Sequence, residues 1–156
     1  MEIGATKAVQ DRLKTTKIEE SKGASLVFCW DTHLTKIKGR NVLFIVNASN
    51  RYTIAMTDIE PRNWNYYTMY ISRVIHGVMQ EMGYSEDQIG QYFKMSGDTT
   101  VTKTHGRKSV GGINRMVMDA QYFGKKLEKE AKYQWELSEY LNRDICQPEG
   151  FDAYGY

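Results

Sequence analysis

The sequence has few cysteines, few prolines and no long apolar run. Its 156 residues include only two prolines and two cysteines, Cys29 and Cys146. The cysteines are far apart and neither belongs to a Cys-x-x-Cys pair, so we expect two reduced thiols, without a disulfide framework or a cysteine-based zinc site. No stretch approaches the roughly 18 apolar residues that span a bilayer, and the N-terminus has no apolar signal region. We therefore expect a cytoplasmic protein with no membrane partner.

The chain also lacks a strong excess of charge of either sign. Its formal net charge is +2, with 26% charged and 41% hydrophobic residues. A dedicated nucleic-acid-binding domain is usually more basic than this, so the overall charge identifies no partner. The length and the apolar share fit one globular domain with its own core.

Short tracts rich in branched and aromatic residues predict a β-sheet. These tracts cover residues 2–5, 26–30, 34–38, 41–47, 52–57 and 99–104. Short separators such as Asp31-Thr32 and Gly39-Arg40 favour antiparallel neighbours, because a parallel return needs a crossover of a dozen or more residues. The continuously apolar run 42–46 is typical of a strand buried on both faces. We predict an α+β fold, in which an antiparallel sheet of four to six strands has its helices chiefly on one face.

Helical periodicity appears between and after these tracts. Apolar residues at steps of three and four predict a helix over about 63–82, and Ser85 with Gln88 forms a capping box for a short second one. Ser109 is expected to cap a last helix, which continues through the charged stretch 125–132 as a long C-terminal helix. We place the core domain at residues 1–123, and a helical extension and tail of the same domain at 124–156.

The junction between the tract 99–104 and the last helix is basic. A helix N-terminus exposes unpaired backbone N–H groups and a partial positive charge, so a cationic turn there can hold an anion or a nucleic acid. The candidate residues for this site are Lys103, His105, Arg107, Lys108 and Ser109. A Walker phosphate loop is excluded, because Val101 occupies the position of its first glycine. The alternative is a solvated turn in which Ser109 only caps the helix.

The residues with catalytic or metal-binding chemistry are scattered. His33, His76 and His105 form no HxxxH or HExxH pair, and no nucleophile, base and orienting group can be assembled from the spacing. We predict no metal site, no cofactor and no catalytic residue, and we favour a protein that is not an enzyme.

Aromatic residues are denser than one buried helix face requires. Trp64, Tyr66, Tyr67 and Tyr70 cluster at the start of the predicted long helix, and Trp135 and Tyr140 follow the charged stretch. We predict that Trp64, Tyr66, Trp135 and Tyr140 belong to a protein interface, where Tyr and Trp are over-represented. Core packing and base stacking are the alternatives for the first group.

Three motifs carry a resemblance. Ala5-Thr6-Lys7, Trp30-x-x-x-Leu34 followed by Val42-Leu43-Phe44-x-x-Asn47, and Lys103-Thr104-x-x-Arg107-x-Ser109-x-x-Gly112-x-Asn114 occur in this order. Together they resemble a family of small bacterial and phage α+β proteins of unknown function, over about residues 1–123. The resemblance implies an α+β domain of bacterial or mobile-element origin and no catalytic residue. The segment after Phe123 is expected to lie outside the family pattern.

Two functional hypotheses follow. The first is a non-catalytic binding protein that docks on a macromolecular partner, such as an anti-CRISPR-like phage inhibitor of a host nuclease or defence factor. The second is a nucleic-acid-binding or phosphate-binding protein, or an enzyme, that uses the basic loop 103–114. The sequence leaves the identity of the partner and the oligomeric state open.

Overall fold

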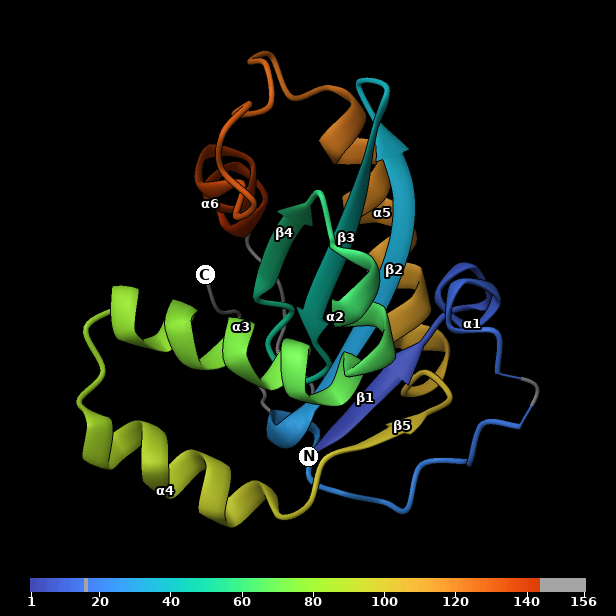
Figure 1. The fold of residues 1–156 in the computed structure, drawn as a ribbon, viewed down its shortest axis with the longest axis vertical. Coiled ribbons are helices and arrows are strands. Elements are labelled where there is room, and N and C mark those ends of the chain that lie inside the picture. Colours follow the sequence, from blue (N-terminus) through green and yellow to red (C-terminus); the bar gives the residue numbers. More distant parts are fainter. Residues whose placement is uncertain (16, 144–156) are drawn as a thin grey trace.

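A five-stranded mixed sheet forms the centre of the protein (Figure 1). The computed structural model describes residues 1–15 and 17–143. The strands are β1 (Glu2–Ala5), β2 (Cys29–Ile37), β3 (Arg40–Asn47), β4 (Thr53–Thr57) and β5 (Thr100–Thr102), in the order β4-β3-β2-β1-β5. The predicted α+β class and number of strands are confirmed. The meander β2-β3-β4 is antiparallel as predicted, whereas β1 lies parallel to both β2 and β5.

Helices cover both faces of the sheet, and most of them lie on one face as predicted (Figure 1). The helices of the first face are α1 (Lys7–Leu13), α2 (Pro61–Asn65), α3 (Tyr67–Glu81) and α4 (Glu86–Ser96). The second face carries α5 (Gly106–Gln121) and α6 (Trp135–Asn142), and a 3₁₀ turn, η1 (Leu26–Phe28), leads into β2. The reason lies in β3: Leu43 and Ile45 join the core under α3, while Phe44 joins the core under α5.

The segment Asp31-Thr32 was predicted to separate two strands, but it lies in the middle of β2. Both residues are fully buried. Thr32 accepts a hydrogen bond from the Tyr67 hydroxyl at 2.7 Å, and Asp31 accepts several hydrogen bonds from the start of α5. Because these partners satisfy the polar side chains, the strand continues through residues that normally favour turns.

The helix boundaries differ from the predicted ones at two places. The predicted helix over 63–82 is interrupted at Tyr66, whose backbone (φ −116°, ψ 46°) is not helical. The predicted long C-terminal helix is two helices, because α5 ends at Gln121 and residues 122–134 are not helical. The capping box of Ser85 and Gln88 is present as predicted. No helix of the described ranges is long and apolar enough to cross a bilayer.

The segment 125–142 is part of the core and does not project from it. Leu127, Leu137 and Leu141 are buried in the core of the second face. The same segment follows the outer edge of β4, where Thr57 N–H donates to the Lys132 carbonyl at 2.7 Å and Ala55 N–H donates to Ser138 Oγ at 3.0 Å. The open edge of the sheet is thereby covered, as sheet edges in soluble proteins usually are.

Candidate functional site

A buried polar cluster lies where β1 and β2 meet the start of α5. Its members, which we call the His105 cluster, are Glu2, Cys29, Asp31, His105 and Ser109. Strand alternation places Glu2, Cys29 and Asp31 on the face that α5 covers. This half of the second face is polar, whereas the half formed by β3 and β4 is apolar.

Asp31 accepts hydrogen bonds from residues at the start of α5. Its carboxylate accepts the His105 backbone N–H at 3.1 Å and His105 Nδ1 at 2.6 Å, and it also accepts the Ser109 hydroxyl. The carboxylate thus lies at a helix N-terminus, where negative charge is favourable. Its space exists because residue 4, paired with Asp31 across the strands, is glycine: a Cβ at Gly4 would lie 1.8 Å from Asp31 Oδ1.

Glu2 binds the other side of the imidazole. Its Oε2 lies 2.9 Å from His105 Nε2 and accepts the Ser21 hydroxyl at 2.6 Å, and its Oε1 accepts the Lys22 backbone N–H at 2.7 Å. Burial favours the neutral acid, but the hydrogen bonds from Ser21, His105 and Lys22 outweigh burial and hold the pKa of Glu2 below its usual range. The carboxylate is therefore ionised at neutral pH.

His105 is held as a cation between these two carboxylates. Burial lowers the pKa of His105, but hydrogen bonding to Asp31, together with Cys29 and Glu2, outweighs burial and raises it to about 10. Both ring nitrogens face a carboxylate, so neither has a lone pair for general-base catalysis. Ser109 donates to Asp31 and not to His105, which differs from the nucleophile-to-histidine bond of a serine catalytic triad.

The predicted anion-binding residues separate in the structure. His105, Arg107, Lys108 and Ser109 line a pocket of about 210 Å³ together with Arg51 from the β3–β4 turn. Lys103 does not line this pocket and forms an ion pair with Glu20. Ser109 lies inside α5 and does not cap it, because the helix begins at Gly106. The imidazole of His105 points into the buried cluster, so the pocket's exposed cations come from Arg107 and Lys108.

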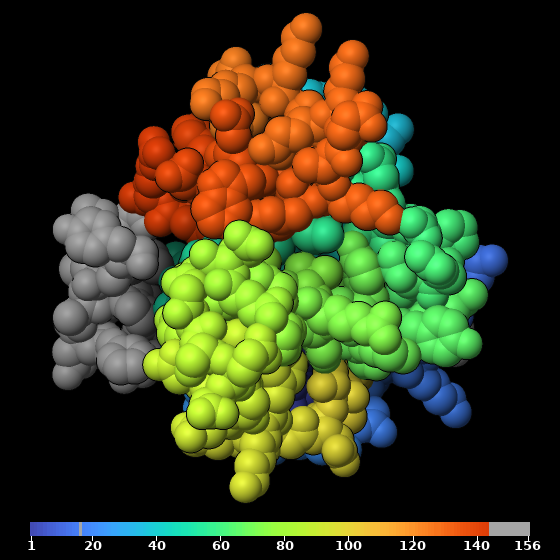
Figure 2. Space-filling model, turned by 60° about the vertical axis from the view of Figure 1, so that its left-hand side comes forward, coloured from blue at the N-terminus to red at the C-terminus, as the bar shows by residue number. Residues whose placement is uncertain are grey.

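A second candidate site, which we call the α2–α3 surface, lies over the first face. A pocket of about 270 Å³ is lined by Arg62, Asn63, Tyr66, Met69, Tyr70 and Arg73. Tyr66 is 65% exposed and Met69 is 45% exposed, and both also line a neighbouring pocket beside α1. Figure 2 shows the side of the molecule on which α3 and α4 lie, with the segment 122–142 above them.

Tyr70, which lines this pocket, carries an unsatisfied polar group. Within the described part of the chain, its buried hydroxyl oxygen has no hydrogen-bond partner. Burial, and to a smaller extent the charge of Glu60, raises the pKa of Tyr70 to about 12. The phenol therefore keeps its proton at neutral pH and retains an unused hydrogen-bond donor beside the pocket.

The predicted interface residues differ in exposure. Trp64 is buried, contrary to the exposure that an interface role requires, because its ring stacks on Tyr67 at 5.5 Å and lies under the Arg12 guanidinium. Tyr66 is exposed as an interface residue must be. Trp135 and Tyr140 are 42% and 38% exposed; the Trp135 ring contacts Tyr133, and the Tyr140 ring contacts Phe123.

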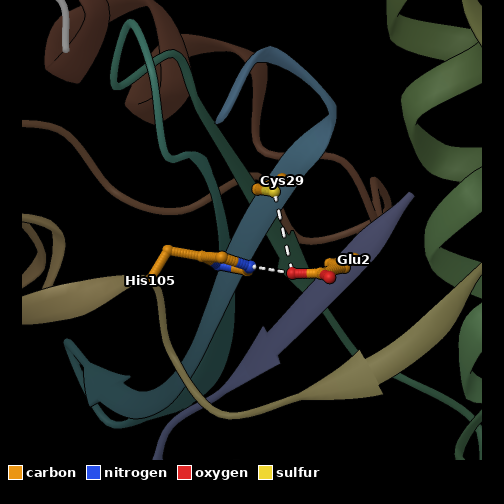
Figure 3. A group of neighbouring side chains, drawn as sticks. All are labelled: Glu2, Cys29 and His105. Atoms are coloured by element: carbon orange, nitrogen blue, oxygen red, sulfur yellow. Dashed lines mark hydrogen bonds and ion pairs between the residues drawn. The ribbon is translucent and has the colours of Figure 1, made fainter. Parts of the chain in front are cut away.

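Sequence reasoning missed Glu2, Cys29 and Asp31 as site residues. They lie more than 70 positions from His105, and only the pairing of β1 with both β2 and β5 brings them to it. It also predicted no metal site, because no histidine has a neighbour at metal-ligand spacing and a site assembled only by the tertiary fold leaves no local pattern. In the structure, one ligand atom each of Glu2, Cys29 and His105 lies within 4.8 Å of the other two (Figure 3).

Comparison with known proteins gives a family and no function. No curated protein and no solved structure matches the chain. One family model matches residues 2–156, so the match includes the segment after Phe123, which was expected to lie outside the family pattern. The chain thus belongs to a family that is defined by a domain of unknown function, DUF6933.

Proposed function

We propose that the protein is a non-catalytic binding protein that docks on a protein partner through the α2–α3 surface. Its pocket accepts an acidic side chain of that partner. The observation that carries this proposal is the buried hydroxyl of Tyr70, which has no partner within the described residues and belongs to a residue that lines a pocket together with Arg62 and Arg73.

The chemistry of the pocket favours a carboxylate as ligand. A buried hydroxyl without a hydrogen bond costs roughly 1–3 kcal/mol, and a partner that supplies an acceptor recovers that free energy. Arg62 already pairs with Glu60 at 2.8 Å, whereas Arg73 has no acidic partner among the described residues. An incoming carboxylate can therefore accept hydrogen bonds from the Tyr70 hydroxyl and the Arg73 guanidinium, which are strong when the acceptor is charged.

The rim of the pocket has the composition of an interface. Tyr, Met and Arg are enriched at protein interfaces, and hot spots are most often Trp, Tyr or Arg. Tyr66, Met69 and Arg73 supply these types on one exposed face, next to a second concavity beside α1. Tyr66 is the expected anchor of the partner.

The test is a pull-down from bacterial lysate followed by an affinity measurement with each captured protein. Tyr66→Ala is expected to weaken binding about 30-fold, the equivalent of ~2 kcal/mol at an interface anchor. Arg73→Glu is expected to abolish binding, because it places a carboxylate opposite the partner's own. Tyr70→Phe is expected to weaken binding while the free energy of unfolding stays equal or rises by about 1 kcal/mol.

The matched control is the double variant Arg107→Ala with Lys108→Ala, which removes two cations from the opposite side of the sheet. A partner of the α2–α3 surface is retained by this control and lost with Arg73→Glu. A partner that Tyr66→Ala and Arg73→Glu both retain at full affinity would contradict the proposal. For a captured partner that is a nuclease or another defence factor, inhibition by the bound protein is measured on that partner itself.

The pocket at the start of α5 supports a second candidate, the binding of a phosphate-bearing ligand or nucleic acid. Arg51, Arg107 and Lys108 line it together, although Asp31 already supplies a negative charge at this helix N-terminus. In fluorescence-anisotropy titrations with a short duplex, the Arg107→Ala and Lys108→Ala double variant should lower the log–log salt slope by about two units. If the wild type shows no binding at low salt, only the docking proposal stands.

A further inference from the structure

Three different metal-ligand types converge inside the His105 cluster. Glu2 on β1, Cys29 on β2 and His105 at the start of α5 each contribute one ligand atom, and Cys29 Sγ and His105 Nε2 both lie beside Glu2 Oε2 (Figure 3). Glu2 Oε2 lies 2.9 Å from His105 Nε2 and 4.0 Å from Cys29 Sγ. The three atoms lie within 4.8 Å of one another. Zinc binds such ligands at about 2.0–2.3 Å, so side-chain shifts of about 1 Å or less bring all three atoms within bonding distance of one ion.

The surroundings orient these ligand atoms as in known metal centres. A metal-binding histidine almost always donates its other ring N–H to a carboxylate or carbonyl, and His105 Nδ1 lies 2.6 Å from Asp31 Oδ1. That bond leaves Nε2 directed at Glu2. The Glu2 carboxylate is itself positioned by the Ser21 hydroxyl and the Lys22 backbone N–H.

We propose that Glu2, Cys29 and His105 bind a divalent metal ion of the zinc type. The set of one thiolate, one imidazole and one carboxylate suits Zn²⁺ or Co²⁺, whereas Mg²⁺ and Ca²⁺ require oxygen ligands. Binding releases the Cys29 thiol proton and the proton between His105 Nε2 and Glu2 to solvent, so that all three ligands hold the metal through lone pairs. Three protein ligands leave one position of a tetrahedral ion for water or another ligand.

The position of the site suits a metal ion that stabilises the fold. The ligands come from β1, β2 and α5, so the ion would join three elements that are distant in the sequence. This inference is independent of the docking proposal, because the α2–α3 surface lies on the other face of the sheet.

The test uses the full-length protein freed of metal and titrated with Co²⁺, whose thiolate complexes have a ligand-to-metal charge-transfer band in the near ultraviolet. We expect one Co²⁺ per chain, with this band, and its loss when Zn²⁺ is added. The matched control is Cys146→Ser, the chain's other cysteine, which should keep both the band and the stoichiometry. In that variant Cys29 is the sole thiol, so the band reports on Cys29 without any change in the cluster.

Variants of the cluster then assign the ligands. Cys29→Ser should abolish the charge-transfer band, and Asp31→Asn, a change to a positioning residue, should weaken Co²⁺ binding about 10- to 100-fold. Zn²⁺ should raise the melting temperature of the wild type and of Cys146→Ser, while Mg²⁺ should not. Absence of a thiolate band in Cys146→Ser, or an unchanged band in a folded Cys29→Ser, would overturn the proposal.

Discussion

At the scale of single residues, Gly4 determines whether the His105 cluster can form. Its position opposite Asp31 in the β1–β2 pair places any Cβ inside the space of the Asp31 carboxylate, 1.8 Å from Oδ1, and 3.0 Å from the Thr104 Cα. Glycine is needed at position 4 because only it leaves space for the Asp31 carboxylate, although glycine is otherwise unfavourable inside a strand.

Gly4→Ala is therefore expected to lower the free energy of unfolding by about 3 kcal/mol or more, because it displaces a buried carboxylate from the groups that stabilise its charge. Gly111→Ala is the control: Gly111 has nothing within 4 Å of its hypothetical Cβ and lies inside α5, so alanine should stabilise by up to about 1 kcal/mol. Urea denaturation measures both. A Gly4→Ala variant whose free energy of unfolding lies within ~0.5 kcal/mol of the wild-type value would contradict the close contact between residue 4 and the Asp31 carboxylate.

The residue scale is also where sequence reasoning was least complete. It identified His105 as part of a basic junction, but it assigned the side chain to a surface anion site. A histidine next to Arg107 and Lys108 in the sequence gives no indication that its ring turns inward to Asp31 and Glu2. That orientation depends on long-range strand pairing, which no local pattern contains.

At the scale of elements, the edge of β4 is covered by side-chain and backbone groups of the C-terminal segment. Ser138 Oγ accepts the Ala55 N–H at 3.0 Å and donates to the Gln134 carbonyl at 2.8 Å, and Ser138 is buried. The Asn142 side chain bonds the Thr53 N–H and carbonyl in the same way. Helix α6 thus takes the place of a sixth strand.

Ser138→Ala should lower the free energy of unfolding by about 1–3 kcal/mol, because it leaves the Ala55 N–H buried without an acceptor. The control is Glu139→Ala on the same helix, which removes only an exposed ion pair with Arg143 and should change stability by less than about 0.5 kcal/mol. Equal melting temperatures for the two variants would show that the β4 edge does not depend on Ser138.

Elements with strong local signals were predicted well. The antiparallel meander, the capping box before α4 and the doubly buried strand β3 follow from periodicity and cap chemistry. The parallel pairing of β1, the continuation of β2 through Asp31 and the end of α5 at Gln121 depend on contacts between distant residues. Charged residues at 125–132 continue a helical pattern, but the helix ends at Gln121 and Leu127 packs into the core of the second face from a non-helical segment.

At the scale of the whole molecule, the sheet separates two cores. The core of the second face includes Phe123, Leu127, Leu137 and Leu141, three of which follow residue 124. The segment 125–142 is thus required for the apolar half of that face, and it closes the β4 edge as well.

A chain cut after Gly124 is expected to lose its cooperative unfolding transition. It would expose the second core and leave β4 as an open edge, so it should also bind a hydrophobic dye and self-associate. Thermal unfolding followed by circular dichroism tests this. A sharp transition close to that of the full chain would restore residues 1–123 as an independent domain.

The position of β1 between β2 and β5 has a consequence for the time at which the fold can form. Residues 2–4 pair with residues 100–102, so the sheet cannot be completed until about two-thirds of the chain has left the ribosome. At roughly 5–20 residues per second, that wait lasts on the order of 5–20 s. Throughout it, the carboxylates of Glu2 and Asp31 are without His105, and β1 lacks one of its two neighbours. The nascent chain therefore depends on late-arriving residues to neutralise and enclose its first strand.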